Sequence, residues 1–285
     1  MHISHNVAVG PLQDYFARSN GRPADVGQYL LCDDAGVRGR YSELHLRSVF
    51  QPILDAATLE PRAHEALLRA KLEDGGEVSP QAVFHRPSQA DEVVFLDRLC
   101  RTVHALNFSI QADPGDVLYL NVDGRHLTHI EGGTHGRTFE NLLQHCGLVP
   151  GQIVLEILES NITDEQRLAE AVAAYRQRGY RIAIDDFGCS HSNFDRLWKL
   201  TPDIVKLDRG LLLEADANPR ARIILPKLVE MLHDLGALVV CEGIETHGQH
   251  KLASDAGVDL VQGFLYARPQ PLLLRERRDV EALSG

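Results

Sequence analysis

The sequence has 285 residues, enough for one large domain or two small ones, and its 44% hydrophobic and 24% charged residues are ordinary for a soluble globular protein. A formal net charge of −11 argues against a general DNA- or RNA-binding protein, which needs a basic surface, although a local cation or metal could still hold a small anionic ligand. No apolar run reaches the roughly 18 residues of a membrane span, and the N-terminus lacks the order of a signal peptide, so we expect no membrane partner.

The five cysteines are odd in number, lie far apart and form no Cys-x-x-Cys pair. This usage argues against a disulfide framework and against a zinc finger. It indicates free thiols in a reducing compartment, and we therefore expect a cytoplasmic protein.

Residues 1–44 are mixed and polar. They favour a short helix at 11–18, a short strand at 28–32 and a turn at 33–36. The segment is too short for an independent sensor domain. We therefore expect an N-terminal arm or cap, residues 1–44, on a main domain of residues 45–285.

Beyond residue 44, short apolar runs alternate with longer amphipathic stretches. This pattern predicts strands at 46–53, 64–69, 117–122, 153–158, 181–185, 204–207, 237–241 and 258–264, and helices at 91–106, 139–145, 164–178, 220–235 and 247–256. About eight alternations of strand and helix indicate a parallel sheet closed into a (β/α)8 barrel. A doubly wound open sheet is the competing architecture, and periodicity does not decide between them. Trp198 follows a helical pattern with Phe194 and Leu197, and we expect it in the core.

The stretch Arg181-Ile-Ala-Ile-Asp-Asp-Phe-Gly188 is an apolar run that ends in two adjacent acids and a glycine. Because side chains alternate along a strand, Asp185 and Asp186 can project the same way only if the strand ends between them. Two crowded carboxylates repel unless positive charge lies between them, and a divalent metal is its simplest source. An ordinary Asp-rich turn is the alternative for this stretch taken alone.

Most of the predicted strands carry a polar residue at or near the carboxyl end. In chain order these residues are Glu65 and Arg69, Asn121, Glu156, Asp185 and Asp186, Lys206, Glu242 and Gln262. In a (β/α)8 barrel the carboxyl ends of the strands converge on the face that holds the active site. Four or more acids there, opposed only by Lys206 and Arg69, would be poorly compensated without a metal. Oxygen ligands without cysteine or histidine favour magnesium, manganese or calcium over zinc.

At these residues the sequence resembles the EAL-domain phosphodiesterases, which hydrolyse the bacterial second messenger cyclic di-GMP. The resemblance covers about residues 42–272. Its motifs are Phe50-Gln-Pro-Ile53, Glu65-Ala-Leu-Leu-Arg69, Asn121-Val122, Glu156-Ile-Leu-Glu159, Asp185-Asp-Phe-Gly188, Val205-Lys-Leu-Asp208, Glu242-Gly-Ile-Glu245 and Gln262-Gly-Phe264. Each motif alone is a weak match, whereas the complete set in this order is very specific.

The resemblance implies a barrel whose first strand is antiparallel to the others and a site that holds two Mg²⁺ or Mn²⁺ ions. The expected ligands of the first ion are Glu65, Asn121, Glu156 and Asp185. Asp185 would bridge to the second ion, which Asp186 also holds, and Glu242 would lie close by, directly or through water. Lys206 is expected to orient or deprotonate the attacking water. Two ions roughly 3.5–4 Å apart can lower the pKa of water and clamp both oxygens of a phosphoryl displacement.

The same resemblance implies contacts to the substrate. The expected residues are Gln51, the motif Glu65, Ala66, Leu67, Leu68 and Arg69, and then Glu245 and Gln262. Arg69 would pair with a phosphate through its planar guanidinium. Asp97 is a candidate for a guanine edge, and a surface helix acid is the equally good alternative. Glu159 is expected to brace the loop after the fifth strand without binding metal.

The loop after the Asp-Asp-Phe-Gly motif departs from the family pattern. Relatives commonly have Thr-Gly-Tyr-Ser-Ser, whereas this chain has Cys189-Ser-His-Ser-Asn193, and Leu158 replaces a threonine in an earlier motif. Serine adopts positive φ less easily than glycine, so Ser190 could change the backbone of this loop. We expect any effect to fall on the catalytic rate, the strength of the dimer or the metal affinity, and the fold to stay intact. A thiol nucleophile formed by Cys189 with His191 is a much weaker alternative for this loop.

Three hypotheses follow for the function. The preferred one is a stand-alone, metal-dependent phosphodiesterase that converts cyclic di-GMP to linear 5′-pGpG, because every expected metal and water-handling position holds the right residue type. The second is a degenerate domain that binds cyclic di-GMP without cutting it, supported only by the altered loop. The third is another metal-dependent hydrolase on a similar barrel, since a fold alone does not fix chemistry. Homodimerisation and a part in biofilm control are expectations inherited from the family.

Overall fold

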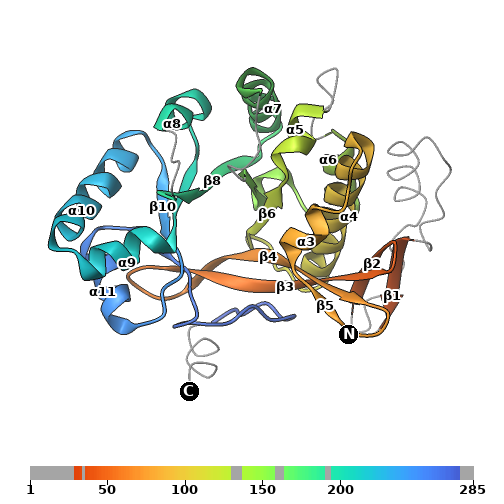
Figure 1. The fold of residues 1–285 in the computed structure, drawn as a ribbon, viewed down its shortest axis with the longest axis horizontal. Helices are drawn as coiled ribbons and strands as arrows, with labels where there is room; N and C mark the ends of the chain where they lie inside the picture. The colour runs from red at the N-terminus through yellow and green to blue at the C-terminus, as the bar shows by residue number, and fades with distance from the viewer. Residues whose placement is uncertain (1–28, 34–35, 130–136, 158–163, 190–193, 277–285) are drawn as a thin grey trace.

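The computed structural model describes residues 29–33, 36–129, 137–157, 164–189 and 194–276 (Figure 1). The strands are β1 (Leu30–Asp33), β2 (Gly36–Tyr41), β3 (Leu44–Asp55), β4 (Pro61–Leu72), β5 (Glu77–Val78), β6 (Leu118–Val122), β7 (Ile153–Ile157), β8 (Arg181–Phe187), β9 (Ile204–Leu207), β10 (Leu238–Cys241) and β11 (Leu260–Val261). The helices are α3 (Pro80–Phe84), α4 (Ala90–Ser109), α5 (Gly124–His129), α6 (Arg137–His145), α7 (Glu165–Gln177), α8 (Phe194–Leu200), α9 (Arg209–Ala217), α10 (Pro219–Asp234) and α11 (His247–Asp255).

Eight of the described strands form a closed barrel, in the order β3, β11, β10, β9, β8, β7, β6 and β4, and the pairing of β3 with β4 closes the ring. β3 is antiparallel to both of its neighbours, whereas the other barrel strands are parallel to one another. The helices lie outside the ring (Figure 1). The predicted barrel with an antiparallel first strand is therefore confirmed, and the open doubly wound sheet is excluded.

The predicted elements agree with the observed ones to within a few residues for most of the barrel. β4 extends three residues beyond its predicted range 64–69 at each end, whereas β11, predicted at 258–264, is observed only at Leu260–Val261. The chain leaves the sheet there because Gly263 packs against the backbone of Ile244, an approach that leaves no space for a Cβ atom. The helices α3, α5 and α9 were not predicted, and α8 was indicated only by the helical pattern of Phe194, Leu197 and Trp198. α3 and α5, of five and six residues, are too short to show a helical period. No helix of the described segments is both long enough and apolar enough to cross a membrane.

β1 and β2 form a hairpin that extends the barrel sheet beyond β3, and β5 pairs with the end of β4. Helix α4 covers this extension: the side chain of Asn107 accepts a hydrogen bond from Val37 N (2.9 Å) and donates one to Val37 O (2.7 Å). β1 overlaps the strand predicted at 28–32, whereas the helix predicted at 11–18 lies outside the described residues. The predicted division at residue 44 therefore falls at the turn between two paired strands.

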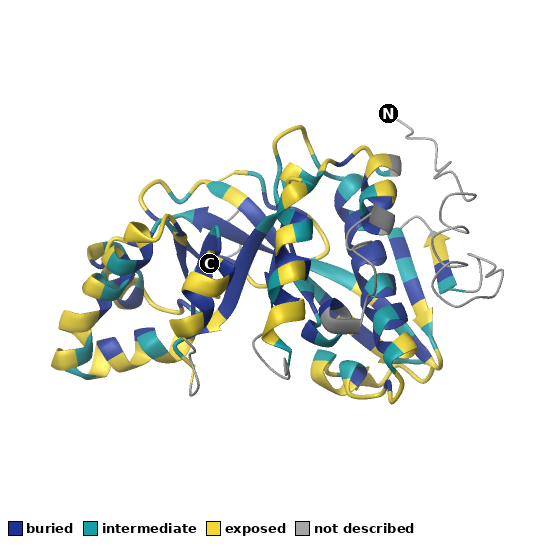
Figure 2. Cartoon of the chain, turned by 90° about the horizontal axis from the view of Figure 1, so that it is seen from above, coloured by how far each residue is buried: buried dark blue, intermediate teal, exposed yellow. Residues whose placement is uncertain are grey.

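The barrel interior has an apolar lower layer and a polar upper layer. Because side chains alternate along a strand, residues two positions apart point into the barrel together. The lower layer is Ile53, Ala63, Tyr119, Val154, Ala183, Ile204 and Val240. Two positions further along the parallel strands, the upper layer is Glu65, Asn121, Glu156, Asp185, Lys206 and Glu242. The strands that carry both layers are mostly buried (Figure 2).

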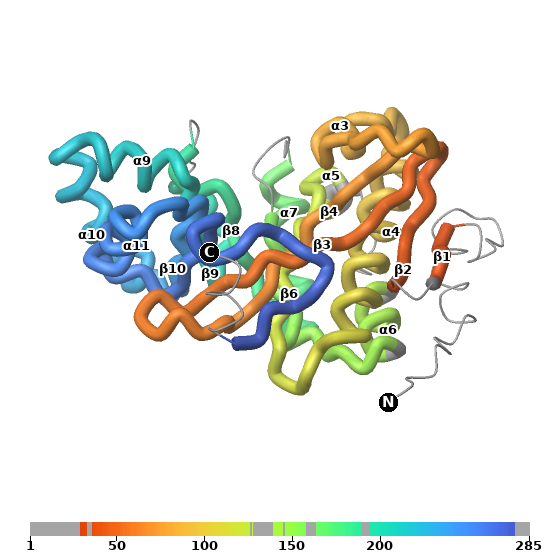
Figure 3. Tube along the Cα trace, turned by 90° about the horizontal axis from the view of Figure 1, so that it is seen from below, coloured from red at the N-terminus to blue at the C-terminus, as the bar shows by residue number. Residues whose placement is uncertain are grey.

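After β11 the chain returns along the edge of β3 (Figure 3). Phe50 and Gln270 exchange two backbone hydrogen bonds, of 2.7 and 3.0 Å. His64 Nε2 lies 2.8 Å from the carbonyl oxygen of Leu274. The last described segment thus ties the end of the barrel to its first two strands.

Trp198 on α8 is 56% exposed, so the prediction that it lies in the core is wrong. Phe194, four residues earlier on the same helix face, is 44% exposed, whereas Leu197 is buried. Helix α8 packs on the barrel through Leu197, and the ring of Phe194 also contacts Phe187 of β8 at 5.5 Å between centroids. Large parts of both aromatic side chains remain on the surface.

Candidate active site

Lys206 lies at the centre of the upper layer of the barrel. Its Nζ atom is 2.5 Å from Glu156 Oε1, 2.6 Å from Glu242 Oε1, 3.2 Å from Asp185 Oδ1 and 3.4 Å from Glu65 Oε2. Each of these side chains comes from a different strand or strand end, and the sheet register brings them together. One buried ammonium group therefore contacts four carboxylates.

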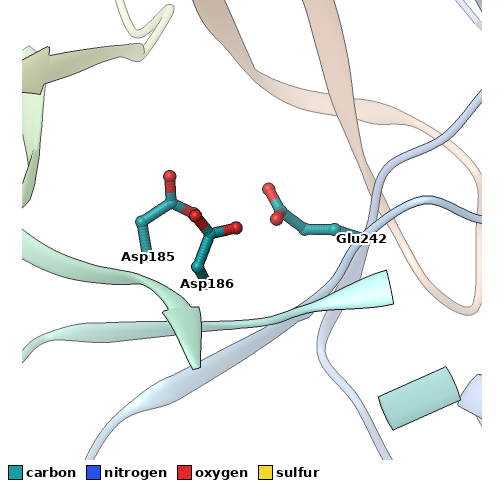
Figure 4. Close-up of side chains that lie close together, drawn as sticks. All are labelled: Asp185, Asp186 and Glu242. Carbon is teal, nitrogen blue, oxygen red and sulfur yellow. The ribbon is translucent and has the colours of Figure 1, made fainter. Parts of the chain in front are cut away.

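Asp185 and Asp186 reach the same space without an end to the strand between them. β8 continues to Phe187, but its pairing with β9 shifts between Ile184 and Phe187, which is one extra residue on β8. Asp186 takes up this extra residue with a left-handed backbone, φ 53°. Both carboxylates then face Glu242 (Figure 4). The expected strand end is thus replaced by a β-bulge.

The carboxylates outnumber the positive charge that faces them. Burial, and after it the neighbouring Glu65, raises the pKa of Glu156 well above its ordinary value. Loss of surrounding water is also the main cause that raises the pKa of Glu242 to about 8 and that of Asp186 to about 6. Burial opposes the charge on Lys206, but the surrounding carboxylates outweigh it and raise the pKa of Lys206 well above its ordinary value. The group of side chains therefore favours a further cation.

The donor atoms fit a divalent cation. Both carboxylate oxygens of Glu156 and Oδ1 of Asp185 are buried, and their contacts with Lys206 lack hydrogen-bond geometry. Asp185, Asp186 and Glu242 each offer an oxygen, and these atoms lie within 4.8 Å of one another. Asn121 Nδ2 donates to Glu65 Oε1 (3.1 Å) and so belongs to the same group. Oxygen donors without thiolate or imidazole suit magnesium, manganese or calcium.

A cavity of about 320 Å³ opens above these carboxylates. In its wall, Gln262 Nε2 donates to Glu65 Oε2 (2.7 Å) and to Gln51 Oε1 (3.3 Å). Arg209 and Glu245 form an ion pair with two contacts, Nη1 to Oε1 and Nη2 to Oε2, each of 2.8 Å. The cavity therefore combines carboxylates that can hold a cation with amide and charged groups that can orient a polar ligand.

Residues 37–269 match the EAL domain family. The chain belongs to this family. Among curated EAL relatives, the probable cyclic di-GMP phosphodiesterase PdeN of Escherichia coli strain K12 is 30% identical over 228 residues, which cover 78% of this chain and 43% of PdeN. An uncharacterized protein of Azorhizobium caulinodans is 33% identical over 246 residues, which cover 82% of this chain and 32% of that protein. The chain thus spans less than half the length of these two relatives.

Solved structures of EAL proteins share the fold. Klebsiella pneumoniae BlrP1, in a complex with manganese and cyclic di-GMP, superimposes with a TM-score of 0.71 at 27% identity over 81% of this chain and 57% of its own. A standalone EAL protein from Vibrio cholerae O395, in its c-di-GMP-bound form, has a TM-score of 0.71 at 24% identity over 83% of this chain and 97% of its own. The likeness to the second protein concerns the fold alone.

The EAL domain brings most of the predicted site residues together. The predicted metal and catalytic residues that share the upper layer or its rim are Glu65, Asn121, Glu156, Asp185, Asp186, Lys206 and Glu242. The predicted substrate residues that line the cavity are Gln51, Glu65, Leu67, Glu245 and Gln262.

Other predicted substrate residues of the EAL domain lie elsewhere. Ala66 and Leu68 point to the opposite face of β4 and are buried in the core outside the barrel, so the structure does not support side-chain contacts from them. Arg69 shares the face of Glu65, but four residues of strand place it about 13 Å further along. It is exposed there, and its Nη1 donates to Leu68 O (2.9 Å). Asp97 is 1% exposed on α4 and is 2.5 Å from Arg101, so neither the guanine contact nor the surface alternative agrees with its position.

Several cavity residues were not predicted from the sequence. They are Asp208, Arg209, Gly243, Gly263 and Phe264, and each lies within or directly beside a motif that the sequence analysis had identified. Position beside a motif was the only signal that could have found them. The predicted brace Glu159, and residues 190–193 of the altered loop, lie outside the described residues. Cys189, the first residue of that loop, is exposed.

Proposed function

We propose that this EAL domain is a metal-dependent phosphodiesterase that hydrolyses cyclic di-GMP to linear 5′-pGpG. The observation that carries the proposal is the set of four carboxylates around Lys206 beneath a cavity of about 320 Å³. The names of related proteins support it, since PdeN is a probable cyclic di-GMP phosphodiesterase and BlrP1 forms a complex with manganese and cyclic di-GMP.

The proposed cofactors are two Mg²⁺ or Mn²⁺ ions. The residues that would hold the first are Glu65, Asn121, Glu156 and Asp185. Asp185 and Asp186 would hold the second, with Glu242 beside them. Such ions, when bound, lower the pKa of water and offset the negative charge of the phosphate.

The chain's own side chains would position the reactants. Lys206 would orient or deprotonate the attacking water from beneath the cavity. The water oxygen would bond to phosphorus while the bond to the 3′ oxygen breaks, and that oxygen would leave with a proton as a free 3′ hydroxyl. Gln51, Gln262 and Glu245 would contact the ligand, and Arg69 would reach a phosphate from the rim with its planar guanidinium.

A second copy of the chain is the proposed macromolecular partner. Phe194 and Trp198 form an exposed aromatic face on α8, the helix that follows the loop expected to support a dimer contact. Large exposed apolar groups on one helix face favour burial against a partner. We therefore propose that this helix forms the homodimer contact.

The test is incubation of the purified protein with cyclic di-GMP and Mg²⁺, Mn²⁺, Ca²⁺ or EDTA, with the products separated by chromatography. We expect pGpG with Mg²⁺ or Mn²⁺ and none with EDTA. Glu65→Gln and Asp185→Asn should lower the rate at least about a hundredfold, because each removes a ligand charge. Asp255→Asn, at an exposed acid of α11, is the matched control and should keep the rate.

Turnover that persists in EDTA and in Asp185→Asn would contradict the proposal. If cyclic di-GMP binds in the presence of each metal ion but no product forms, the protein is a receptor instead. The first follow-up variant would then restore loop 189–193 to the family sequence. Absence of binding would favour another hydrolase.

A further inference from the structure

A second cavity, of about 550 Å³, lies at the opposite end of the barrel from the carboxylates. It is lined by the amino ends of the parallel strands and by the turn between β3 and β4, and it is partly open to solvent. Barrels of eight strands are normally filled by bulky side chains. Here Ala56, Ala57 and Ala63 line the space, so small side chains leave it open beneath the lower layer.

Arg181 and Tyr119 present hydrogen-bond donors to this cavity. They lie in one row across three neighbouring strands, with Val154 between them. The Nε atom of Arg181 is buried without a hydrogen-bond partner, and no carboxylate of the described segments forms an ion pair with its guanidinium. Tyr119 is 2% exposed, and its hydroxyl has no hydrogen bond within the described part of the chain.

The two side chains can act on one ligand group. A phenolic hydroxyl and a guanidinium both donate hydrogen bonds, and the register of β6, β7 and β8 sets Tyr119 and Arg181 in the same row of the cavity wall.

The other charged groups of the cavity already have partners. Arg62 pairs with Asp55 (3.2 Å), and Asp55 also accepts hydrogen bonds from the backbone N–H of residues 57 and 58. Asp259 accepts a hydrogen bond from Val239 N (2.7 Å) and lies 2.9 Å from His233 Nε2. Among the described side chains that line this cavity, the guanidinium of Arg181 and the hydroxyl of Tyr119 are therefore the donors that lack an acceptor.

We propose that this cavity binds a small organic carboxylate. Its carboxylate group would accept hydrogen bonds from Arg181 and Tyr119, and its apolar body would pack against the alanines, Val117 and Leu238. A carboxylate suits the site better than a phosphate dianion, because Asp55 and Asp259 also line the cavity and would repel the second negative charge of the dianion. The site shares no residue with the proposed phosphodiesterase centre and does not depend on that function.

The test uses the full chain and two probes, benzoate and hexanoate, titrated by calorimetry and by NMR chemical shifts. We expect one saturable site per chain, with the shifts confined to residues of this cavity. Arg181→Gln should weaken binding at least tenfold and Tyr119→Phe about threefold. Arg220→Gln, at an exposed arginine of α10, is the matched control and should leave binding unchanged. Benzyl alcohol, which has the ring without the charge, should bind at least tenfold more weakly than benzoate.

Three results would overturn the proposal. The first is the absence of saturable binding for both probes, or shifts confined to the other end of the barrel. The second is unchanged affinity in Arg181→Gln and Tyr119→Phe. The third is equal affinity for benzyl alcohol and benzoate, which would indicate apolar packing alone. Circular dichroism checks the fold of each variant, and if Arg181→Gln does not fold, Tyr119→Phe and the alcohol decide the question.

Discussion

At the scale of single residues, Lys206 carries the charge balance of the upper layer. Replacing it by methionine would leave four carboxylates without a facing cation, and an uncompensated buried charge costs about 3–5 kcal/mol. We therefore expect Lys206→Met to lose about that much free energy of unfolding in urea titrations with EDTA. Added Mg²⁺ should return part of the loss.

Lys227→Met is the matched control for this prediction. Lys227 is an exposed lysine of α10, so the same substitution there removes a charge without uncovering a carboxylate. Equal stabilities for the two variants would mean that the carboxylates of the upper layer do not need the ammonium.

His104 gives the protein a predictable response to acid. It is buried on α4 with Nδ1 2.7 Å from Ser48 Oγ, and burial lowers the pKa of His104 to about 3 from its ordinary 6.5. The folded state therefore binds this proton less readily than the unfolded chain. Neutral His104 therefore contributes to stability above pH 6.5. As the pH falls from 6.5 toward 3, this contribution to the free energy of unfolding decreases by about 1.4 kcal/mol per pH unit.

The measurement for His104 is the free energy of unfolding in urea between pH 7 and pH 4. His104→Gln should show a shallower fall than the native chain over this range. An identical slope in the two proteins would show that other groups cause the acid sensitivity.

At the scale of elements, local sequence was sufficient where a residue's neighbours along the chain decide its conformation. The apolar run of β9 and the amphipathic pattern of α11 gave boundaries within a residue of those observed. The place of the acids at the carboxyl ends of the predicted strands also predicted their convergence. The bulge at Asp186 and the exposure of Trp198 depend on pairing and packing between distant segments, which no local pattern records.

Gly263 shows such a long-range constraint and can be tested. A Cβ atom there would meet the backbone of Ile244, which cannot move aside as a flexible side chain can. We expect Gly263→Ala to lower the free energy of unfolding by about 1–3 kcal/mol and to reduce turnover, because the residue also lines the active-site cavity. Gly151→Ala, where a Cβ atom meets nothing within 4 Å, should be close to neutral in both thermal melting and activity.

At the scale of the whole molecule, the exposed face of α8 is the part that predicts an assembly. Trp198→Glu should weaken self-association at least tenfold in sedimentation experiments, because it places a charge where an aromatic ring would be buried. Ile223→Glu is the control, since Ile223 is 63% exposed on α10 and lies outside that face. An equal effect of both variants would remove α8 from the contact.

The closure of the ring sets the order in which the molecule can fold. β3 pairs with β4 at once through a short turn, but its other edge waits for β11, about two hundred residues later in the chain. Contacts between such distant segments form slowly, because the long intervening chain must first be brought together. A nascent chain leaving the ribosome therefore carries an incomplete ring, with part of one edge of β3 unpaired, until β11, the last described strand, has been made. Premature termination before residue 260 would leave seven of the eight barrel strands without closure and open to proteases and aggregation.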